Sequence, residues 1–342
     1  MKVAIGYHIV EGPWGGGNQF ARALEAALKA EGHRIVHDLA DADIDLILLV
    51  DPRARLQNFP FGAGHILRYL TFRNPKAVVV HRINECDERK NTRTMNFRLR
   101  LANYCADHTV FIGTWLRNLA VWRCDESHGT SIILNGADES IFHARGYRLW
   151  DGVSPLKLVT HHWGGNWMKG FDIYDRLDRM LDMPMWKERI AFTYVGNLPK
   201  GYRFRNARYL PPLVGHTLAD ELRSHHVYVT GSVNEPGGFH QNEGGLCGLP
   251  LLYRNSGALP EYCYGFGVMF DGPRDFESAL ERMTLGYGNF AAKMPLYPHT
   301  ASRMAANYVN LFRDLVARSD EIAGARHLWR DPSAFLLNQI FW

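Results

Sequence analysis

Short apolar segments that alternate with helical patterns recur in two series along the chain, and this recurrence constrains the fold more than any other feature. The first series opens with Lys2–Ile5 and the second with Leu156–Thr160. Phe20, Leu24 and Leu28 are spaced as on the buried face of a helix. Strands that alternate with helices predict parallel sheets covered by helices. We therefore expect an α/β protein with two doubly wound domains, which suits a length of 342 residues.

The boundary between the two series falls in a polar segment. Arg145–Pro155 contains glycine and proline and reads as a linker. The sequence thus predicts a first domain over residues 1–148, a second over 149–325 and a tail over 326–342. The tail is apolar and aromatic, with Trp329, Phe335 and Phe341 among its residues. An exposed tail of this kind would be costly, so we expect it to pack back on the first domain.

The stretch Ser232–Glu261 carries two glutamates, Glu235 and Glu243, with a Pro-Gly-Gly turn between them. Glu243 is predicted near the start of a helix that leads to the apolar run Leu249–Tyr253. The start of a helix offers free backbone N–H groups to an anionic ligand, and paired glycines let the backbone approach that ligand. Taken alone, the two glutamates also fit a loop and a helix cap with solvated carboxylates.

The whole stretch resembles the Glu-x7-Glu segment of retaining glycosyltransferase family 4, whose members have the GT-B architecture. That resemblance implies two Rossmann-like domains facing across a cleft. It also implies a retaining, metal-independent, hexosyltransferase-type reaction with a nucleotide-sugar donor, UDP or GDP being the expected nucleotide, and no other cofactor. A glycan, lipid-linked or small-molecule acceptor would serve polysaccharide biosynthesis. The residues in matching order are Ser232, Glu235, Gly238, Glu243, Gly248, Pro250, Gly257 and Glu261.

The resemblance assigns roles to residues of the predicted second domain. Lys169 ends a segment that closes in Lys-Gly, where the family's lysine contacts the donor diphosphate. Glu243 would accept both ribose hydroxyls, and Glu235 would hold hydroxyls of the donor sugar. Many members carry an arginine before the Lys-Gly pair, whereas His162, Trp163 and Asn166 stand there in this chain. The other residues expected to contact the donor are Asn166, Gly237, Gly238 and Phe239.

Two segments of the predicted first domain also match the family. The glycine-rich Gly12–Asn18 follows the first strand with neither the dinucleotide fingerprint nor the P-loop spacing. In the family this position faces the donor, which implicates Gly15, Gly16 and Gly17. The polar run at residues 81–84 follows the predicted strand Ala77–Val80, where α/β folds bind ligands. The resemblance makes His81 a catalytic residue, and Arg82 and Asn84 are expected to contact the acceptor.

A second matching string, Asn-Gly-x-Asp-x3-Phe at Asn135–Phe142, resembles the stretch that leads family members out of their first domain. By its chemistry alone it is a turn signature.

Charge is unevenly distributed over the chain, whose formal net charge is +4. Between Arg53 and Arg123 there are 13 Lys or Arg residues and 4 Asp or Glu residues, a local excess of +9. Such a patch attracts an anionic acceptor or an anionic membrane surface, or is simply a solvated face. The mild overall charge does not indicate a nucleic-acid partner.

The five cysteines are odd in number and lack a metal-binding spacing. No secretory leader is recognised, so we expect reduced thiols and a cytoplasmic protein. No apolar run has the length of a membrane span, so any membrane contact would be peripheral, at the inner face. The adjacent His161 and His162 do not predict a metal site, because neighbouring strand residues point to opposite faces.

Three other functions share this predicted architecture. A nucleotide-sugar epimerase would turn over donor with no acceptor present. A phosphorylase would require inorganic phosphate. A non-catalytic nucleotide- or carbohydrate-binding protein would show neither activity, because a fold does not by itself determine function.

Overall fold

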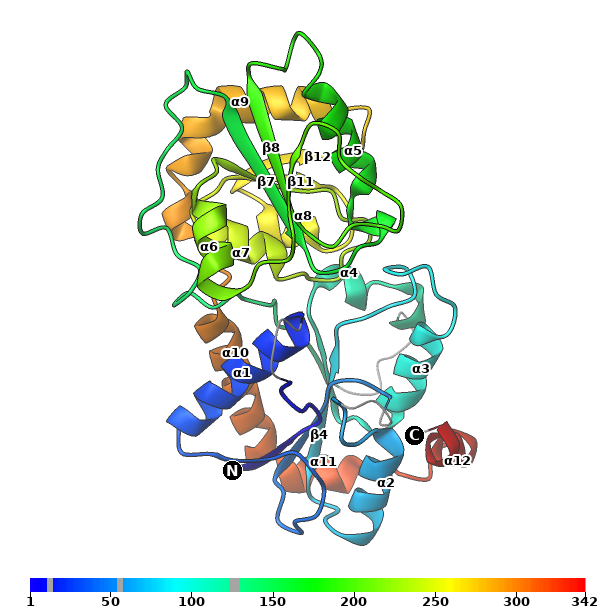
Figure 1. Ribbon diagram of the computed structural model, residues 1–342. Helices are drawn as coiled ribbons and strands as arrows, with labels where there is room; N and C mark the ends of the chain where they lie inside the picture. The colour runs from blue at the N-terminus through cyan, green and yellow to red at the C-terminus, as the bar shows by residue number, and fades with distance from the viewer. Residues whose placement is uncertain (11–14, 54–57, 123–128, 342) are drawn as a thin grey trace. The chain divides into compact units, whose positions relative to one another are not determined.

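The computed structural model describes residues 1–10, 15–53, 58–122 and 129–341 (Figure 1). The chain forms two compact units. Unit 1 comprises Met1–Leu134 and Ser302–Trp342, and unit 2 comprises Asn135–Ala301. Each unit has a six-stranded sheet whose neighbouring strands are all parallel. The predicted α/β class, with two doubly wound units, is therefore confirmed.

The sheet of unit 1 has the strand order β2-β1-β3-β4-β5-β6. The order reverses between β1 and β3, so the chain winds outward from this point in both directions. The strands are β1 (Lys2–Ile5), β2 (Arg34–Val36), β3 (Leu46–Leu49), β4 (Val78–Ile83), β5 (His108–Phe111) and β6 (Gly129–Ile132).

Helices cover the sheet of unit 1, and the last three helices of the chain belong to this unit almost entirely. They are α1 (Gly16–Ala30), α2 (Ala63–Phe72), α3 (Met95–Ala102), α4 (Thr114–Arg117), α10 (Ala301–Ala317), α11 (Ser319–Ala325) and α12 (Pro332–Phe341), with short 3₁₀ turns η1 (Asn103–Cys105) and η2 (Ala120–Trp122).

The sheet of unit 2 has the order β12-β11-β10-β7-β8-β9. Here the order reverses between β7 and β10. The strands are β7 (Leu156–His162), β8 (Ile190–Gly196), β9 (Arg208–Leu210), β10 (Val227–Thr230), β11 (Leu251–Arg254) and β12 (Gly267–Phe270). The helices are α5 (Phe171–Met180), α6 (Gly215–Arg223), α7 (His240–Leu246), α8 (Leu259–Cys263) and α9 (Phe276–Ala291), with the 3₁₀ turns η3 (Trp167–Lys169) and η4 (Met294–Leu296).

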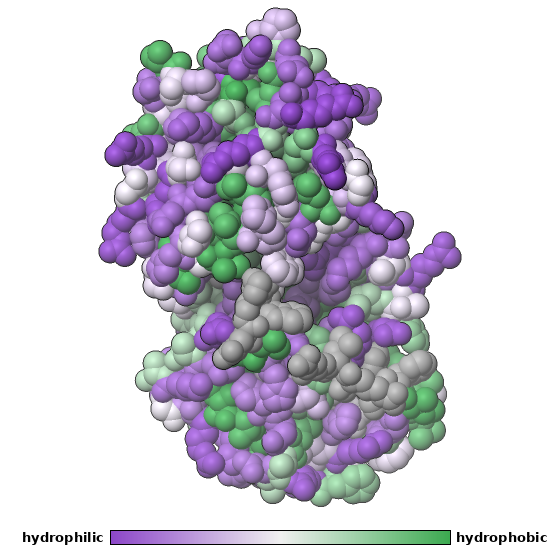
Figure 2. All heavy atoms as spheres, viewed as in Figure 1, coloured by the Kyte–Doolittle hydropathy of each residue, from purple (hydrophilic) through white to green (hydrophobic). Residues whose placement is uncertain are grey.

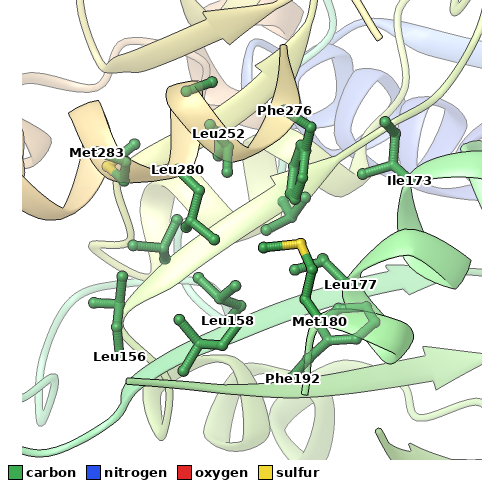
Figure 3. Packing of buried hydrophobic residues seen from close by; sticks show 14 of the residues in the cluster. Leu156, Leu158, Ile173, Leu177, Met180, Phe192, Leu252, Phe276, Leu280 and Met283 are labelled. Atoms are coloured by element: carbon green, nitrogen blue, oxygen red, sulfur yellow. The ribbon is translucent and has the colours of Figure 1, made fainter. Parts of the chain in front are cut away.

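Helices α5 and α9 bury their apolar faces on the sheet of unit 2 (Figure 3). Phe171, Tyr174 and Leu177 recur at helical spacing along α5, and all three are fully buried. Each buried leucine or phenylalanine contributes about 1.5–3 kcal/mol through removal of apolar surface from water. The packing fixes the amino end of α5 beside the carboxyl end of β7. The surface in view carries hydrophilic and hydrophobic side chains in close mixture (Figure 2).

The borders of the two units differ from the predicted divisions at residues 148–149 and 325–326. The chain enters unit 2 at Asn135, because the backbone N–H of Asn135 donates to Tyr262 Oη (2.7 Å) and its carbonyl accepts from Asn242. The predicted linker Arg145–Pro155 therefore lies within unit 2. The chain leaves this unit at Ala301, and α10 then packs in unit 1, where Tyr308 contacts Phe20.

Residues 326–341 pack against α2, α3 and the following turn of unit 1. Phe335 joins the buried cluster of Ile66, Leu67 and Leu70. The Arg326 guanidinium donates to both carboxylate oxygens of Asp107, at 2.8 and 2.6 Å, and both side chains are buried.

Candidate functional site

The strand order of unit 2 determines where a ligand site can form. Strand β7 lies beside β10, and the strands that follow each of them lie on opposite sides of this pair. The segments leaving β7 and β10 therefore diverge, which opens a crevice at the carboxyl ends of the two strands. Within unit 2, the residues predicted to bind the donor come from these two segments, 161–170 and 231–243. The topology thus brings together the two sequence motifs, which lie about 70 residues apart.

Lys169 and Glu235 meet at this switch point. The Lys169 ammonium donates to Glu235 Oε2 at 2.7 Å. The side chain of Lys169 is 14% exposed and that of Glu235 only 2%. A buried carboxylate needs a charged or hydrogen-bonding partner, and the lysine supplies one. The pair therefore holds a cation at the edge of the crevice, where an anionic ligand would meet it.

Close backbone contact holds the loops that carry this pair. Gly170 has φ +99°, and a Cβ there would lie 2.4 Å from the carbonyl carbon of Gly231. Only glycine fits both the left-handed conformation and this approach. The backbone N–H of Val233 donates to Met168 O at 2.7 Å. The glycine of the Lys-Gly pair therefore lets the loop after β7 lie directly on the loop after β10.

Arg254, the last residue of β11, holds the same region together through hydrogen bonds. Its guanidinium binds both carboxylate oxygens of Asp172, at 3.0 and 2.6 Å, and donates to Gly231 O at 2.9 Å. A bidentate pair of this kind is strong and directional. It joins the first turn of α5 to the loop after β10.

Glu243 lies in the first turn of α7 and contacts an imidazole. His161 Nε2 is 2.5 Å from Glu243 Oε2, and both side chains are nearly buried. An ionised carboxylate only accepts hydrogen bonds, so His161 donates through Nε2. On the other side of the ring, Tyr228 Oη lies 3.1 Å from Nδ1. The imidazole is therefore held by hydrogen bonds to Tyr228 and Glu243, and it orients the Glu243 carboxylate.

His162 faces a different helix from His161, as the alternation of strand side chains predicts. Its Nε2 accepts from Tyr174 Oη at 2.6 Å, on α5. Burial lowers the pKa of His162 well below its usual value, and the nearby His240, Lys169 and His161 lower it further. Burial also raises the pKa of Tyr174, so the phenol keeps the proton that it donates. His162 is therefore a neutral acceptor beneath the crevice.

The turn between the two glutamates carries buried polar atoms. Asn135 Nδ2 donates to Gly237 O at 2.6 Å, and Gln241 Nε2 donates to Gly238 O at 2.6 Å. Among the described residues, Gln241 Oε1 and Ser232 Oγ are buried without a hydrogen-bond partner. Buried polar atoms of this kind are costly unless water or a ligand satisfies them. The turn therefore presents fixed carbonyls together with groups able to bind a polar ligand.

The remaining predicted donor residues of unit 2 flank these groups. Phe239 is 9% exposed and precedes α7, which begins at His240. Gly237 has φ +150°. Asn166 is exposed and immediately precedes the turn η3, and its carbonyl accepts from the backbone N–H of Lys169 at 3.0 Å.

In unit 1 the structure corrects the prediction that residues 81–84 follow the end of a strand. Strand β4 continues to Ile83, so His81 and Arg82 lie within it and only Asn84 follows it. His81 is fully buried and its Nδ1 lies 2.8 Å from Asn103 Oδ1. Arg82 faces the opposite side, with its guanidinium 3.9 Å from the centre of the Phe20 ring. Alternation along the strand sends the two side chains under different covering elements.

The part of the glycine-rich segment that the structure describes, Gly15–Asn18, lies at the switch point of unit 1, after β1. Gly12, Pro13 and Trp14 fall outside the described residues. Gly15 immediately precedes α1, and the helix begins at Gly16. A Cβ at Gly17 would lie 2.8 Å from Tyr7 Oη, so a larger residue there would require the Tyr7 ring to shift.

Comparison with known proteins places these observations in a wider context. No family model matches the chain, and no curated protein matches it either. Several solved structures match the chain. The chain has the GT-B fold. It is similar to sucrose-phosphate synthase from Thermosynechococcus elongatus, with a TM-score of 0.64 and 13% identity over 92% of this chain and 99% of that one. It is also similar to Anabaena HepE in complex with UDP-glucose, with a TM-score of 0.60 and 13% identity over 95% and 98% of the two chains.

A third GT-B structure similar to this chain is the catalytic domain of starch synthase IV from Arabidopsis thaliana, bound to ADP and acarbose. The TM-score is 0.60 and the identity 14%, over 89% of this chain and 79% of that one. At these identities the comparisons establish the fold.

Three functional candidates of this GT-B chain were missed at the level of sequence: His161, Tyr228 and Arg254. His161 was considered only as half of a histidine pair. Its partner Glu243 is 82 residues away, and only the pairing of β7 with β10 brings them together. The strand order reveals the contact, because His161 lies at the end of β7 and Glu243 follows the neighbouring strand β10.

Two other kinds of feature are absent from the residues that the structure describes. Within ranges 1–10, 15–53, 58–122 and 129–341, no group of three or more His, Cys, Asp or Glu side chains is arranged to hold a metal ion. Within the same ranges, no helix combines the length and the apolar character needed to cross a membrane.

Proposed function

We propose that this chain is a retaining, metal-independent glycosyltransferase of family 4 that moves a hexose from a nucleotide-sugar to a carbohydrate, lipid-linked or small-molecule acceptor. The observation that carries the proposal is the gathering of Lys169, Glu235, His161 and Glu243 at the switch point of unit 2. The order of motif residues from Ser232 to Glu261 supports the same assignment.

Each paired group has a role in this proposal. Glu243, oriented by His161, accepts the two ribose hydroxyls, since a carboxylate has acceptor sites for both. Lys169 turns from Glu235 to the donor diphosphate when the donor binds. Glu235 is then available to the hydroxyls of the donor sugar. The arginine found in many family members is absent, so the backbone of Gly237 and Gly238 takes a larger share of the phosphate contacts.

The reaction replaces one glycosidic bond with another. The bond between the anomeric carbon and the diphosphate oxygen breaks, and a bond from that carbon to an acceptor hydroxyl oxygen forms. The acceptor's proton passes to the departing diphosphate. Electrostatic stabilisation of the leaving group is usually the largest catalytic term, and Lys169 supplies positive charge for it. The resemblance assigns a catalytic role to His81. It also assigns contacts with the acceptor to Arg82 and Asn84.

The nucleotide is the part of the proposal most open to direct measurement. HepE was crystallised with UDP and UDP-glucose, and starch synthase IV with ADP. These complexes favour UDP or another nucleoside diphosphate as the leaving group here. We therefore propose a thermal-shift panel of UDP, GDP, ADP, dTDP and CMP on the wild type, Glu243→Ala and Glu188→Ala. Glu188 is an exposed glutamate of unit 2 and serves as the matched control.

One diphosphate should stabilise the wild type and Glu188→Ala but not Glu243→Ala. At about a hundred times its dissociation constant, a ligand adds roughly 2.7 kcal/mol to the free energy of unfolding. The absence of a shift with every nucleotide would overturn the donor site. With the donor known, the anomeric configuration of the product tests retention, and activity in excess EDTA tests metal independence. Turnover of donor without acceptor would instead indicate an epimerase.

A further inference from the structure

Unit 1 concentrates its exposed apolar side chains on one group of neighbouring elements. In the described part of this unit, the large hydrophobic side chains that are exposed lie on α2, on α3 and in the segment that contains α12. We call them the apolar patch. They are Phe72, Phe97, Trp329, Leu336, Leu337 and Ile340, with exposed fractions of 81, 55, 61, 56, 37 and 70%.

Helix α12 buries Phe335 but turns three other apolar side chains away from the unit. Leu336, Leu337 and Ile340 share the outer face of the helix and are exposed. On the inner face, Asn338 is fully buried and its Nδ2 donates to Leu101 O at 3.0 Å. A helix whose only role is to cover the unit would place leucines inside and asparagine outside. The reversed pattern indicates that the outer face contacts a binding partner.

Helix α12 is held firmly enough to present this face. Phe335 is buried in the core cluster beside α2, and Trp329 stacks on it with ring centres 4.4 Å apart. Arg68 of α2 donates to Gln339 Oε1 at 2.6 Å. Figure 1 shows α12 near α2 and α3, in agreement with these contacts. Phe72 lies one turn beyond Arg68 on α2, so it projects from the side of α2 that borders α12.

The charge on these three helices has a single sign. Helix α2 contains Arg68, α3 contains Arg98 and Arg100, and none of α2, α3 and α12 contains an aspartate or a glutamate. A second copy docked through the same surface would bring arginines toward arginines, which disfavours a symmetric dimer. The complement of an apolar and cationic surface is an apolar and anionic one.

We propose that the apolar patch docks unit 1 on an anionic lipid bilayer. Leucine, isoleucine and phenylalanine side chains enter the boundary between headgroups and acyl chains, and the arginines contact lipid phosphates. Trp329 has the amphipathic ring that favours this boundary. The contact is peripheral and does not depend on the donor site of unit 2.

The test is sedimentation with sucrose-loaded vesicles, of phosphatidylcholine alone or with phosphatidylglycerol added. The full chain should bind the anionic vesicles and not the zwitterionic ones. The double variant Leu336→Glu with Ile340→Glu should lower the partition coefficient about tenfold or more, because two apolar anchors become anions. Leu285→Glu, at an 89% exposed position on α9 of unit 2, is the matched control and should bind as the wild type does.

A second arm tests the electrostatic part. Arg98→Gln and Arg100→Gln should each weaken binding about fivefold, and high salt should weaken binding of the wild type. Unfolding temperatures check that every variant is folded. Failure of the wild type to sediment with anionic vesicles, or undiminished binding by the folded Leu336→Glu, Ile340→Glu variant, would overturn the proposal. A dimer in analytical ultracentrifugation that this variant abolishes would assign the patch to a second copy instead.

Discussion

The two units have similar sheets, yet their predicted functional residues occupy different kinds of position. In unit 2 the segments that follow β7 and β10 carry Lys169, Glu235 and Glu243, and each carboxylate meets a basic partner. In unit 1, His81 and Arg82 lie inside β4, and the side chains are buried on opposite faces of the sheet.

The difference shows that proximity to the end of a strand is not enough to form a site. Residues in loops beyond neighbouring strands can turn toward one another across a switch point. Residues inside a strand must alternate between faces that helices cover. In unit 1 the switch point lies between β1 and β3, so the segment of Gly15–Gly17, which follows β1, occupies the position equivalent to the Lys169 segment that follows β7 in unit 2. Substitutions at Lys169, His81 and His161 test this contrast, and a further one tests a buried imidazole of unit 2.

The largest effect is expected at Lys169. Lys169→Met removes the cation at the switch point and leaves Glu235 in a buried position, so the transfer rate should fall about a hundredfold or more. Lys200→Met, at an exposed lysine of the same unit, is the control and should leave kcat unchanged. Steady-state kinetics with the donor identified by the nucleotide panel provides the measurement. Equal rates in both variants would remove Lys169 from the proposed chemistry.

His81 tests the other side of the comparison. His81→Leu removes one of two donors to the buried Asn103 Oδ1, the other being Thr109 Oγ1 at 3.0 Å, and should lower the free energy of unfolding of unit 1 by about 1 kcal/mol. If the catalytic role also holds, the transfer rate falls while nucleotide affinity stays as in the wild type. Urea unfolding and isothermal titration with the nucleotide separate the two effects. A destabilised variant with a normal transfer rate would leave His81 with a structural role only.

The imidazoles of unit 2 predict a pH dependence of stability. Burial, with smaller effects of Lys157 and His225, lowers the pKa of His226 to about 4, and its Nδ1 accepts from the backbone N–H of Lys157 at 3.0 Å. The unfolded chain binds this proton below about pH 6.5 and the folded chain does not, so stability falls as the pH falls from about 6.5 toward 4. His226→Gln keeps an acceptor and should reduce the loss between pH 7 and pH 5 by at most about 2 kcal/mol. An unchanged pH profile in urea unfolding would contradict this assignment.

The smallest effect is expected at His161. This residue orients the Glu243 carboxylate, and the proposal gives it no contact with the reacting atoms. His161→Leu removes the donor to Glu243 and should weaken nucleotide binding about tenfold. His161→Gln can still donate an N–H and should restore most of the affinity. Isothermal titration of both variants with the nucleotide measures the two affinities. Equal losses in the two variants would show that the ring only packs.

Local features of the sequence predicted much of unit 2 correctly. Gly170 and Gly257 stand at positions with positive φ, where a Cβ would lie within 2.4 Å of Gly231 and 2.3 Å of Glu235 backbone atoms respectively. The positive φ is a local property that a motif glycine signals, whereas the close approach to Gly231 or Glu235 joins segments distant in the sequence. Other features depended on contacts that no local pattern contains, as the extension of β4 through His81 and Arg82 shows.

The sequence by itself determined the alternation of strands and helices, the glycines of the two loops and the acidic residues between them. Each of these follows from side-chain periodicity or from backbone conformations open to glycine. Tertiary structure alone decided that β7 lies beside β10, that His161 therefore meets Glu243, and that α12 buries Asn338 and exposes its leucines. These outcomes depend on packing between segments far apart in the chain, and no periodicity within one segment encodes its distant neighbour.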